Sequence, residues 1–136
     1  MLKSIQIFFV SCFTICLTAC GNNQAAPESI SDSPTATGEA LFRQNGCHAC
    51  HAVVAGVDTP NVGPNLAGLG IQAAQHLANP AYTGQADSVE AYLQESILLP
   101  EIYLVEGFQP IMPNTYSAVL TDEQVEALVA YMVSLK

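Results

Sequence analysis

Two cysteines and a histidine stand close together in the segment Cys47-His48-Ala49-Cys50-His51. The spacing Cys-x-x-Cys-His is typical of a c-type haem attachment site. Two thiols on one turn can each add to a vinyl group of the same porphyrin, and the next residue then places an imidazole beneath the iron. The segment therefore predicts one covalently bound haem, held by Cys47 and Cys50, with His51 as an axial ligand.

Other chemistries suit these residues less well. A structural zinc site needs two separated ligand pairs, and beyond this cluster only His76 remains as a histidine. A thioredoxin-like dithiol would need a βαβ setting, and a plain disulfide between Cys47 and Cys50 would leave His51 unexplained. His48 stands at the variable part of the motif and is expected to face solvent.

The second axial ligand decides between an electron carrier and a catalyst. Met112 is the best candidate, because Pro110 and Pro113 stiffen its loop and reduce the entropy lost when the thioether is held against iron. A methionine that only fills a gap in the core is the alternative. Met132, in the apolar stripe of the last expected helix, and His76 are the remaining rivals for this position.

Three helices are expected to position these residues, and strand signals are weak, so the predicted fold class is all-α. The first helix spans about residues 37–45, directly before the cysteine motif. The second spans about 87–99, where Asp87 and Glu90 fit a capping box. The third begins after Thr121, and its apolar residues recur at i, i+3, i+4 and i+7. These helices and their loops would wrap around one haem.

A long segment over residues 52–86 connects the first two helices and is rich in Gly, Pro and Asn. Loops of this length are uncommon unless something orders them. A bound cofactor would order this one, and a short helix around residues 70–78 is compatible with the sequence.

The first 20 residues have the layout of an export signal, with Lys3, an apolar stretch over residues 5–17, and small residues up to Cys20. This stretch is shorter than the roughly 20 apolar residues that a spanning helix needs. The sequence LTAC at residues 17–20 resembles the lipobox of bacterial lipoproteins, which implies cleavage before Cys20 and lipidation of that residue.

We therefore expect three parts in the chain. Residues 1–19 are a lipoprotein signal peptide, residues 20–36 are the lipidated Cys20 with a flexible tether, and residues 37–136 are the folded domain. The tether sequence is polar, with two prolines and no hydrophobic period. A lipid anchor would keep the domain outside the cytoplasm, on the periplasmic or cell-surface side of a membrane.

Composition indicates a packed domain with a negative surface. Charged residues make up 11% of the sequence and apolar residues 50%. Acids outnumber bases by 12 to 3, so no basic stripe is available to bind nucleic acid. Two explanations suit this charge equally well. It keeps the protein soluble, or it complements a redox partner protein that has a basic docking patch.

Together these residues resemble class I cytochrome c over essentially all of residues 37–136. The resemblance implies that fold, with one haem c. It also implies that Gly38 and Phe42 on the first helix contact the last helix at Leu128 and Tyr131.

The pair Gly63-Pro64 resembles the family's loop in which the proline carbonyl accepts the proton of the proximal histidine, so Pro64 would orient His51. Residues 92–100 and 105–113 resemble more specifically the cytochrome c domain fused to subunit II of caa-type oxidases. The chain departs from that fused form because it has no cupredoxin domain and no cysteine pair for a binuclear copper site.

The chain also lacks tryptophan and has almost no basic side chains, with three Lys and Arg in all. Hydrogen bonds to the haem propionates would therefore come from tyrosine, amides or water, with Tyr103 and Tyr116 as the tyrosine candidates.

The expected function is electron carriage rather than catalysis. His51 and Met112 would keep the iron six-coordinate while one electron at a time passes along a respiratory or photosynthetic chain, for example to a terminal oxidase. One alternative is a haem enzyme or gas-binding sensor with a labile sixth ligand, although His76 is the only distal acid or base that the sequence offers. Another is a fixed subunit of a larger respiratory complex.

Overall fold

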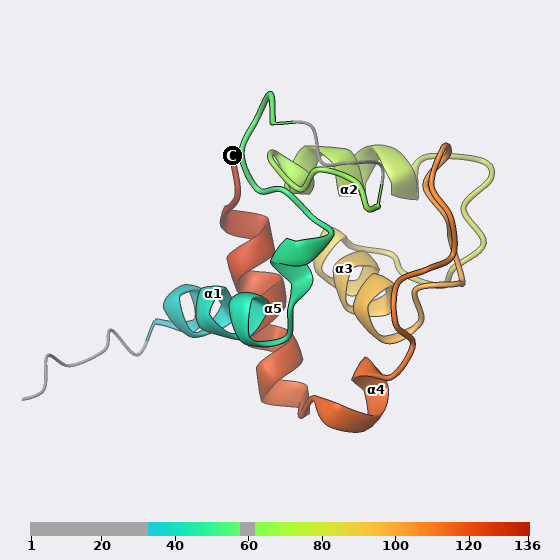
Figure 1. The fold of residues 1–136 in the computed structure, drawn as a ribbon. Coiled ribbons are helices and arrows are strands. Elements are labelled where there is room, and N and C mark those ends of the chain that lie inside the picture. The colour runs from blue at the N-terminus through green and yellow to red at the C-terminus, as the bar shows by residue number, and fades with distance from the viewer. Residues whose placement is uncertain (1–32, 58–61) are drawn as a thin grey trace, which may run out of the picture.

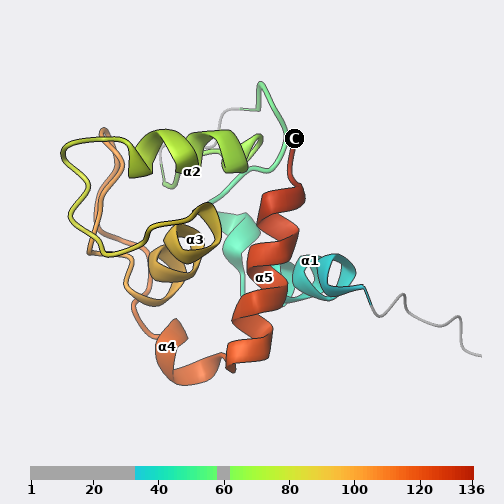
Figure 2. The same ribbon diagram turned by 180° about the vertical axis from the view of Figure 1, so that it is seen from behind.

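The computed structural model describes residues 33–57 and 62–136, so the expected signal peptide, Cys20 and most of the tether lie outside the described residues. The described part consists of helices and loops without strands, which confirms the all-α prediction (Figures 1 and 2). In chain order the elements are α1 (Pro34–Gln44), the short 3₁₀ helix η1 (Cys47–Ala49), α2 (Leu69–Leu77), α3 (Val89–Leu98), α4 (Tyr116–Val119) and α5 (Asp122–Ser134). None of the helices in this described part is long and apolar enough to span a bilayer.

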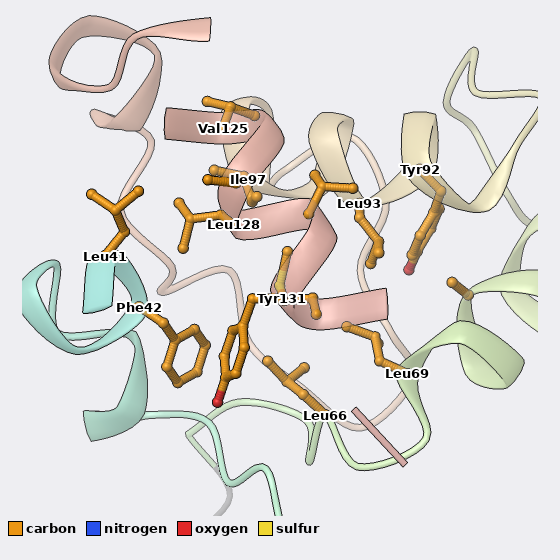
Figure 3. Packing of buried hydrophobic residues seen from close by; sticks show 14 residues of the cluster. Leu41, Phe42, Leu66, Leu69, Tyr92, Leu93, Ile97, Val125, Leu128 and Tyr131 are labelled. Carbon is orange, nitrogen blue, oxygen red and sulfur yellow. The ribbon is translucent and has the colours of Figure 1, made fainter. Parts of the chain in front are cut away.

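Helices α1 and α5 cross at close range (Figure 2). Gly38 makes the crossing possible, because a Cβ at this position would overlap the Ala127 carbonyl and lie 2.7 Å from the Cβ of Tyr131. One turn later, the ring of Phe42 packs on the ring of Tyr131 with centroids 5.5 Å apart (Figure 3). The expected contact between the first and last helices is present, and Leu128 is buried in the same core.

Helix α5 begins where the sequence predicts. The backbone N–H of Gln124 donates to the Thr121 hydroxyl oxygen at 3.4 Å, and the backbone N–H of Thr121 donates to Gln124 Oε1 at 3.0 Å. This reciprocal capping box satisfies two backbone donors at the helix start. The buried face of α5 carries Val125, Ala127, Leu128, Val129, Tyr131 and Met132.

The predicted capping box of Asp87 and Glu90 is wrong. Ser88 is the N-cap of α3, and its hydroxyl accepts a hydrogen bond from the Ala91 amide at 3.2 Å. Serine and aspartate are both common at N-caps, so two such residues in a row leave the start of a helix undetermined in the sequence. Helix α1 starts at Pro34, inside the segment predicted as a tether, because proline suits the first helical position.

The long segment between α1 and α3 is held by its own side chains, and it contains the expected short helix as α2. The Asn65 amide donates to the carbonyls of Val54 at 2.9 Å and Val57 at 2.8 Å. The Gln72 amide donates to the Ala67 carbonyl at 2.6 Å. Side-chain amides therefore supply part of the order that was expected from a bound cofactor.

Candidate functional site

A mainly apolar cavity of about 330 Å³ lies between the helices, and every helix contributes to its wall. The wall includes all four residues that were predicted to bind haem or its iron, namely Cys47, Cys50, His51 and Met112. Cavities of a few hundred Å³ with apolar walls and a few polar groups are typical of cofactor sites in proteins.

The cysteine motif follows α1 directly because the chain reverses at Gly46. This glycine has φ +74°, a left-handed conformation that costs glycine little. The amide nitrogens of Cys50 and His51 then both donate to the Cys47 carbonyl, at 3.2 and 3.0 Å. The tight turn therefore brings two free thiols and one imidazole to the same cavity. His48 is exposed, as expected.

The His51 ring is held by the loop that contains Gly63 and Pro64. Its Nδ1 lies 2.8 Å from the Pro64 carbonyl oxygen. Since a carbonyl can only accept, Nδ1 carries the proton and Nε2 is the nitrogen with a free lone pair. A Cβ at Gly63 would lie 2.6 Å from Cε1 of His51, so glycine leaves the space that the ring occupies.

Burial lowers the pKa of His51, and its hydrogen bond to Pro64 opposes that change. The imidazole is therefore neutral at ordinary pH, as a metal ligand must be. A fixed tautomer and a fixed ring plane are the features that outer partners usually give to a metal-binding histidine.

Burial raises the pKa of the Cys47 thiol, and it also raises that of Tyr116, which lies beside Cys47. Reactive redox cysteines have lowered pKa values and electropositive surroundings. The pKa of Cys47 is shifted in the opposite direction, so the structure gives no support to a thioredoxin-like dithiol. Nor are any three His, Cys, Asp or Glu side chains of residues 33–57 and 62–136 grouped so that they could hold a metal ion.

Met112 and both of its rivals line the cavity. Met132 belongs to the buried core on α5, with 7% of its surface exposed. Met112 is half-buried in the loop between α3 and α4, outside the core cluster of the described residues. Close to it, the Ile111 amide donates to the Gln109 carbonyl at 2.8 Å, which tightens the loop.

The structure separates the two tyrosines that were candidates for the propionates. The Tyr116 hydroxyl donates to the Asn45 carbonyl at 3.2 Å. Tyr103 instead lies with His76, with its hydroxyl oxygen 3.5 Å from Nδ1 of that ring. Sequence reasoning did not pair His76 with Tyr103, because the two residues are 27 positions apart and share no local pattern.

These side chains suit a covalently bound haem. Two free thiols on one turn, a neutral histidine oriented by a backbone carbonyl, and a methionine thioether line one apolar cavity. Nitrogen and sulfur donors of this kind are those that hold haem iron in electron-transfer proteins.

The comparisons with known proteins agree with this chemistry. Residues 35–136 match the family model described as Cytochrome c, and this match includes the whole cavity wall. A search of curated proteins found no match. The family carries electrons and binds haem c covalently, and Cys47 and Cys50 stand at the positions of its attachment motif. On the strength of this match and of the site just described, the chain belongs to the cytochrome c family.

Proposed function

We propose that the protein is an extracytoplasmic carrier that moves one electron at a time through a His/Met-ligated haem c in a respiratory or photosynthetic chain. The main support for this proposal is that His51 and Met112 line the same cavity as the two cysteines of the attachment motif. Two protein ligands leave no open position for a substrate, so carriage suits this site better than catalysis does.

Each residue has a separate task in the proposal. Cys47 and Cys50 would hold the haem through thioether bonds. His51 would bind the iron through Nε2, because Pro64 engages Nδ1 at 2.8 Å. When bound, the haem supplies an iron that alternates between two oxidation states, and a thioether ligand such as Met112 favours the reduced state. Since the protein holds both ligands, little has to move when an electron arrives or leaves.

Two observations favour Met112 over its rivals. Met132 is already part of the core packing between α5 and its neighbours. The His76 ring stacks on Tyr92, with centroids 5.8 Å apart and an interplanar angle of 25°, and its Nδ1 lies near the Tyr103 hydroxyl. The loop residue Met112 has neither commitment, so its thioether is the one available to the iron.

Two matched substitutions test the ligand assignment. Met112→Leu keeps the volume but removes the thioether, so we expect a lower midpoint potential and prompt binding of carbon monoxide to the reduced haem. Met132→Leu makes the same chemical change in the core and should leave both properties unchanged. The assignment is wrong if Met132→Leu, and not Met112→Leu, opens the iron.

The proposal also includes membrane attachment. Its support is the sequence of residues 1–20, whose apolar stretch and LTAC ending are typical of a lipoprotein signal. Lipidation of Cys20 would hold the carrier on the periplasmic or cell-surface side of a membrane, from which a tether lets it reach partners.

The likeness of residues 92–100 and 105–113 to the cytochrome c domain of caa-type oxidase subunit II supports a terminal oxidase as one acceptor of the electrons. A redox partner with a basic docking patch would suit the acids of this chain. Glu101 and Glu106 are exposed on the segment that follows α3, whereas Asp58 lies outside the described residues.

A further inference from the structure

The cavity wall carries several polar side chains, among them hydrogen-bonded groups at two places. One place is beside Cys47, where Tyr116 donates to the Asn45 carbonyl. The other is formed by His76 at the end of α2 and Tyr103 in the segment after α3. In Figures 1 and 2 the carboxyl end of α2 lies beside this later segment, on the side of the molecule away from α1.

The second place is a connected polar group. The Tyr103 hydroxyl lies 3.5 Å from Nδ1 of His76 and accepts a hydrogen bond from the side-chain amide of Asn79 at 3.3 Å. The rings of His76 and Tyr103 are also in contact, with centroids 5.7 Å apart. Both side chains line the cavity that would hold the haem.

If the proposed function holds, the chemistry of the porphyrin identifies the part of the haem that would contact His76 and Tyr103. Haem carries its two vinyl groups on one half of the ring and its two propionates on the other half. If Cys47 and Cys50 hold the vinyl groups, the propionate carboxylates would lie on the half of the porphyrin turned away from the cysteines. His76 and Tyr103 belong to the carboxyl end of α2 and to the segment after α3, which lie away from α1, and the cysteine motif directly follows α1.

Charge points to the same pair. In the described residues the fixed cations are Arg43 and Lys136, and neither lines the cavity. Arg43 is moreover paired with Glu39 at 2.8 Å on the surface of α1. A carboxylate taken out of water needs hydrogen bonds and a counter-charge. Since His51 is engaged by Pro64, His76 is the cavity histidine that can provide that charge.

We propose that His76 and Tyr103 bind a haem propionate, with Tyr103 donating through its hydroxyl and His76 pairing with the carboxylate when it is protonated. The pair then couples the midpoint potential to pH. A proton on His76 adds positive charge near the haem and favours the reduced form, which has one more electron. The potential therefore falls as pH rises through the pKa of His76.

The titratable groups around His76 are consistent with this coupling. The rings of Tyr92 on α3 and of Tyr103 contact the His76 ring. Tyr82 contacts both of these tyrosines, and its hydroxyl bonds to Glu95. The Glu95 carboxylate already has partners, since it accepts hydrogen bonds from the Tyr82 hydroxyl and from the backbone N–H of Gln85. Burial raises the pKa of Tyr92 to about 12, so that ring stays neutral. Burial lowers the pKa of His76, and an adjacent carboxylate acts in the opposite direction.

The test measures the midpoint potential of the haem-loaded protein from about pH 5 to pH 9, the range in which histidine changes charge. The native protein should show one downward step in potential as pH rises, and His76→Gln should remove that step. His48→Gln deletes the exposed histidine of the same chain and should keep it. Tyr103→Phe should keep the step and lower the potential at every pH, because a donor to the carboxylate is lost.

The inference is overturned if the native potential does not change with pH, or if His76→Gln retains the step. Visible spectra of the same samples keep this result separate from the proposed function. Native and variant proteins should all show low-spin haem with the charge-transfer band of iron bound to a thioether. If His76→Gln instead opens the iron, His76 is an axial ligand, and both the inference and the Met112 assignment are wrong.

Discussion

Gly63 is the residue whose lack of a side chain most directly shapes the proposed iron site. It is buried, and the atoms nearest to a Cβ at this position would all belong to the His51 ring, at 2.6 to 3.0 Å. Contacts below 3 Å force something to move. The ring cannot shift without stretching its hydrogen bond to Pro64, so space and hydrogen bonding fix the same orientation.

Gly63→Ala should therefore displace His51 and weaken its proposed bond to the haem iron. We expect poorer haem incorporation, or a mixture of high-spin and low-spin haem, in the visible spectrum of the purified protein. Gly70→Ala is the control, since a Cβ there meets nothing within 4 Å, and alanine in a helix gains up to about 1 kcal/mol over glycine. Equal spectra for the two variants would mean that Gly63 does not hold the ring.

Site residues that lie next to one another in the chain are easier to predict from the sequence than those that the fold brings together. The attachment cysteines and His51 form a contiguous motif whose spacing carries the chemistry, so the sequence suffices to propose them. The hydrogen bond of His51 to Pro64 joins residues 13 positions apart and was expected only from a family resemblance. No comparable pattern links His76 to Tyr103, whose proximity depends on how α2 packs against the segment after α3.

At the scale of the elements, α5 supports the site because it packs on α1 and sends Leu128 and Met132 to the cavity wall. Its start depends on the capping box of Thr121 and Gln124. Helix α1 has Ser33 at the equivalent position, but that side chain makes no capping hydrogen bond. The two N-caps therefore form a natural comparison.

Thr121→Ala should lower the free energy of unfolding of the haem-loaded protein by about 1 kcal/mol, the usual cost of losing an N-cap hydrogen bond. Ser33→Ala should change it by less than about 0.5 kcal/mol, because no such bond is lost. Denaturant titrations followed by far-ultraviolet circular dichroism measure both values. Equal losses in the two variants would show that the Thr121 cap contributes nothing to stability.

The elements differ in how well the sequence predicts them. The start of α5 is determined by four consecutive residues, so it was predicted correctly. Helix α3 starts later than predicted because Ser88, and not its neighbour Asp87, takes the N-cap. The four-residue helix α4 and the 3₁₀ turn η1 were not predicted, since such short helices depend on their surroundings more than on local propensity.

For the molecule as a whole, the excess of acids is the feature that bears on its partners. The full sequence has a formal net charge of −9 at pH 7. Within the described residues Arg43 is already paired with Glu39, and Glu101 and Glu106 are exposed on the segment after α3. A negative field of this kind speeds encounters with positive partners, and salt screens it.

Stopped-flow kinetics with small redox reagents of opposite charge measure this field. The rate constant for oxidation of the reduced protein by a cationic cobalt(III) complex should fall as ionic strength rises. The rate constant with anionic ferricyanide should rise under the same conditions, because salt screens a repulsion. If the two reagents respond to salt alike, net charge does not steer the encounter.

The central claim is that two protein ligands, His51 and Met112, fill both axial positions of the haem. The visible spectrum of the haem-loaded native protein, oxidised and reduced, with and without carbon monoxide, tests it most directly. With both positions filled, the protein should show sharp low-spin bands that the gas does not change. A high-spin spectrum, or one that shifts promptly with carbon monoxide, would contradict it and would indicate a site for ligand binding or catalysis.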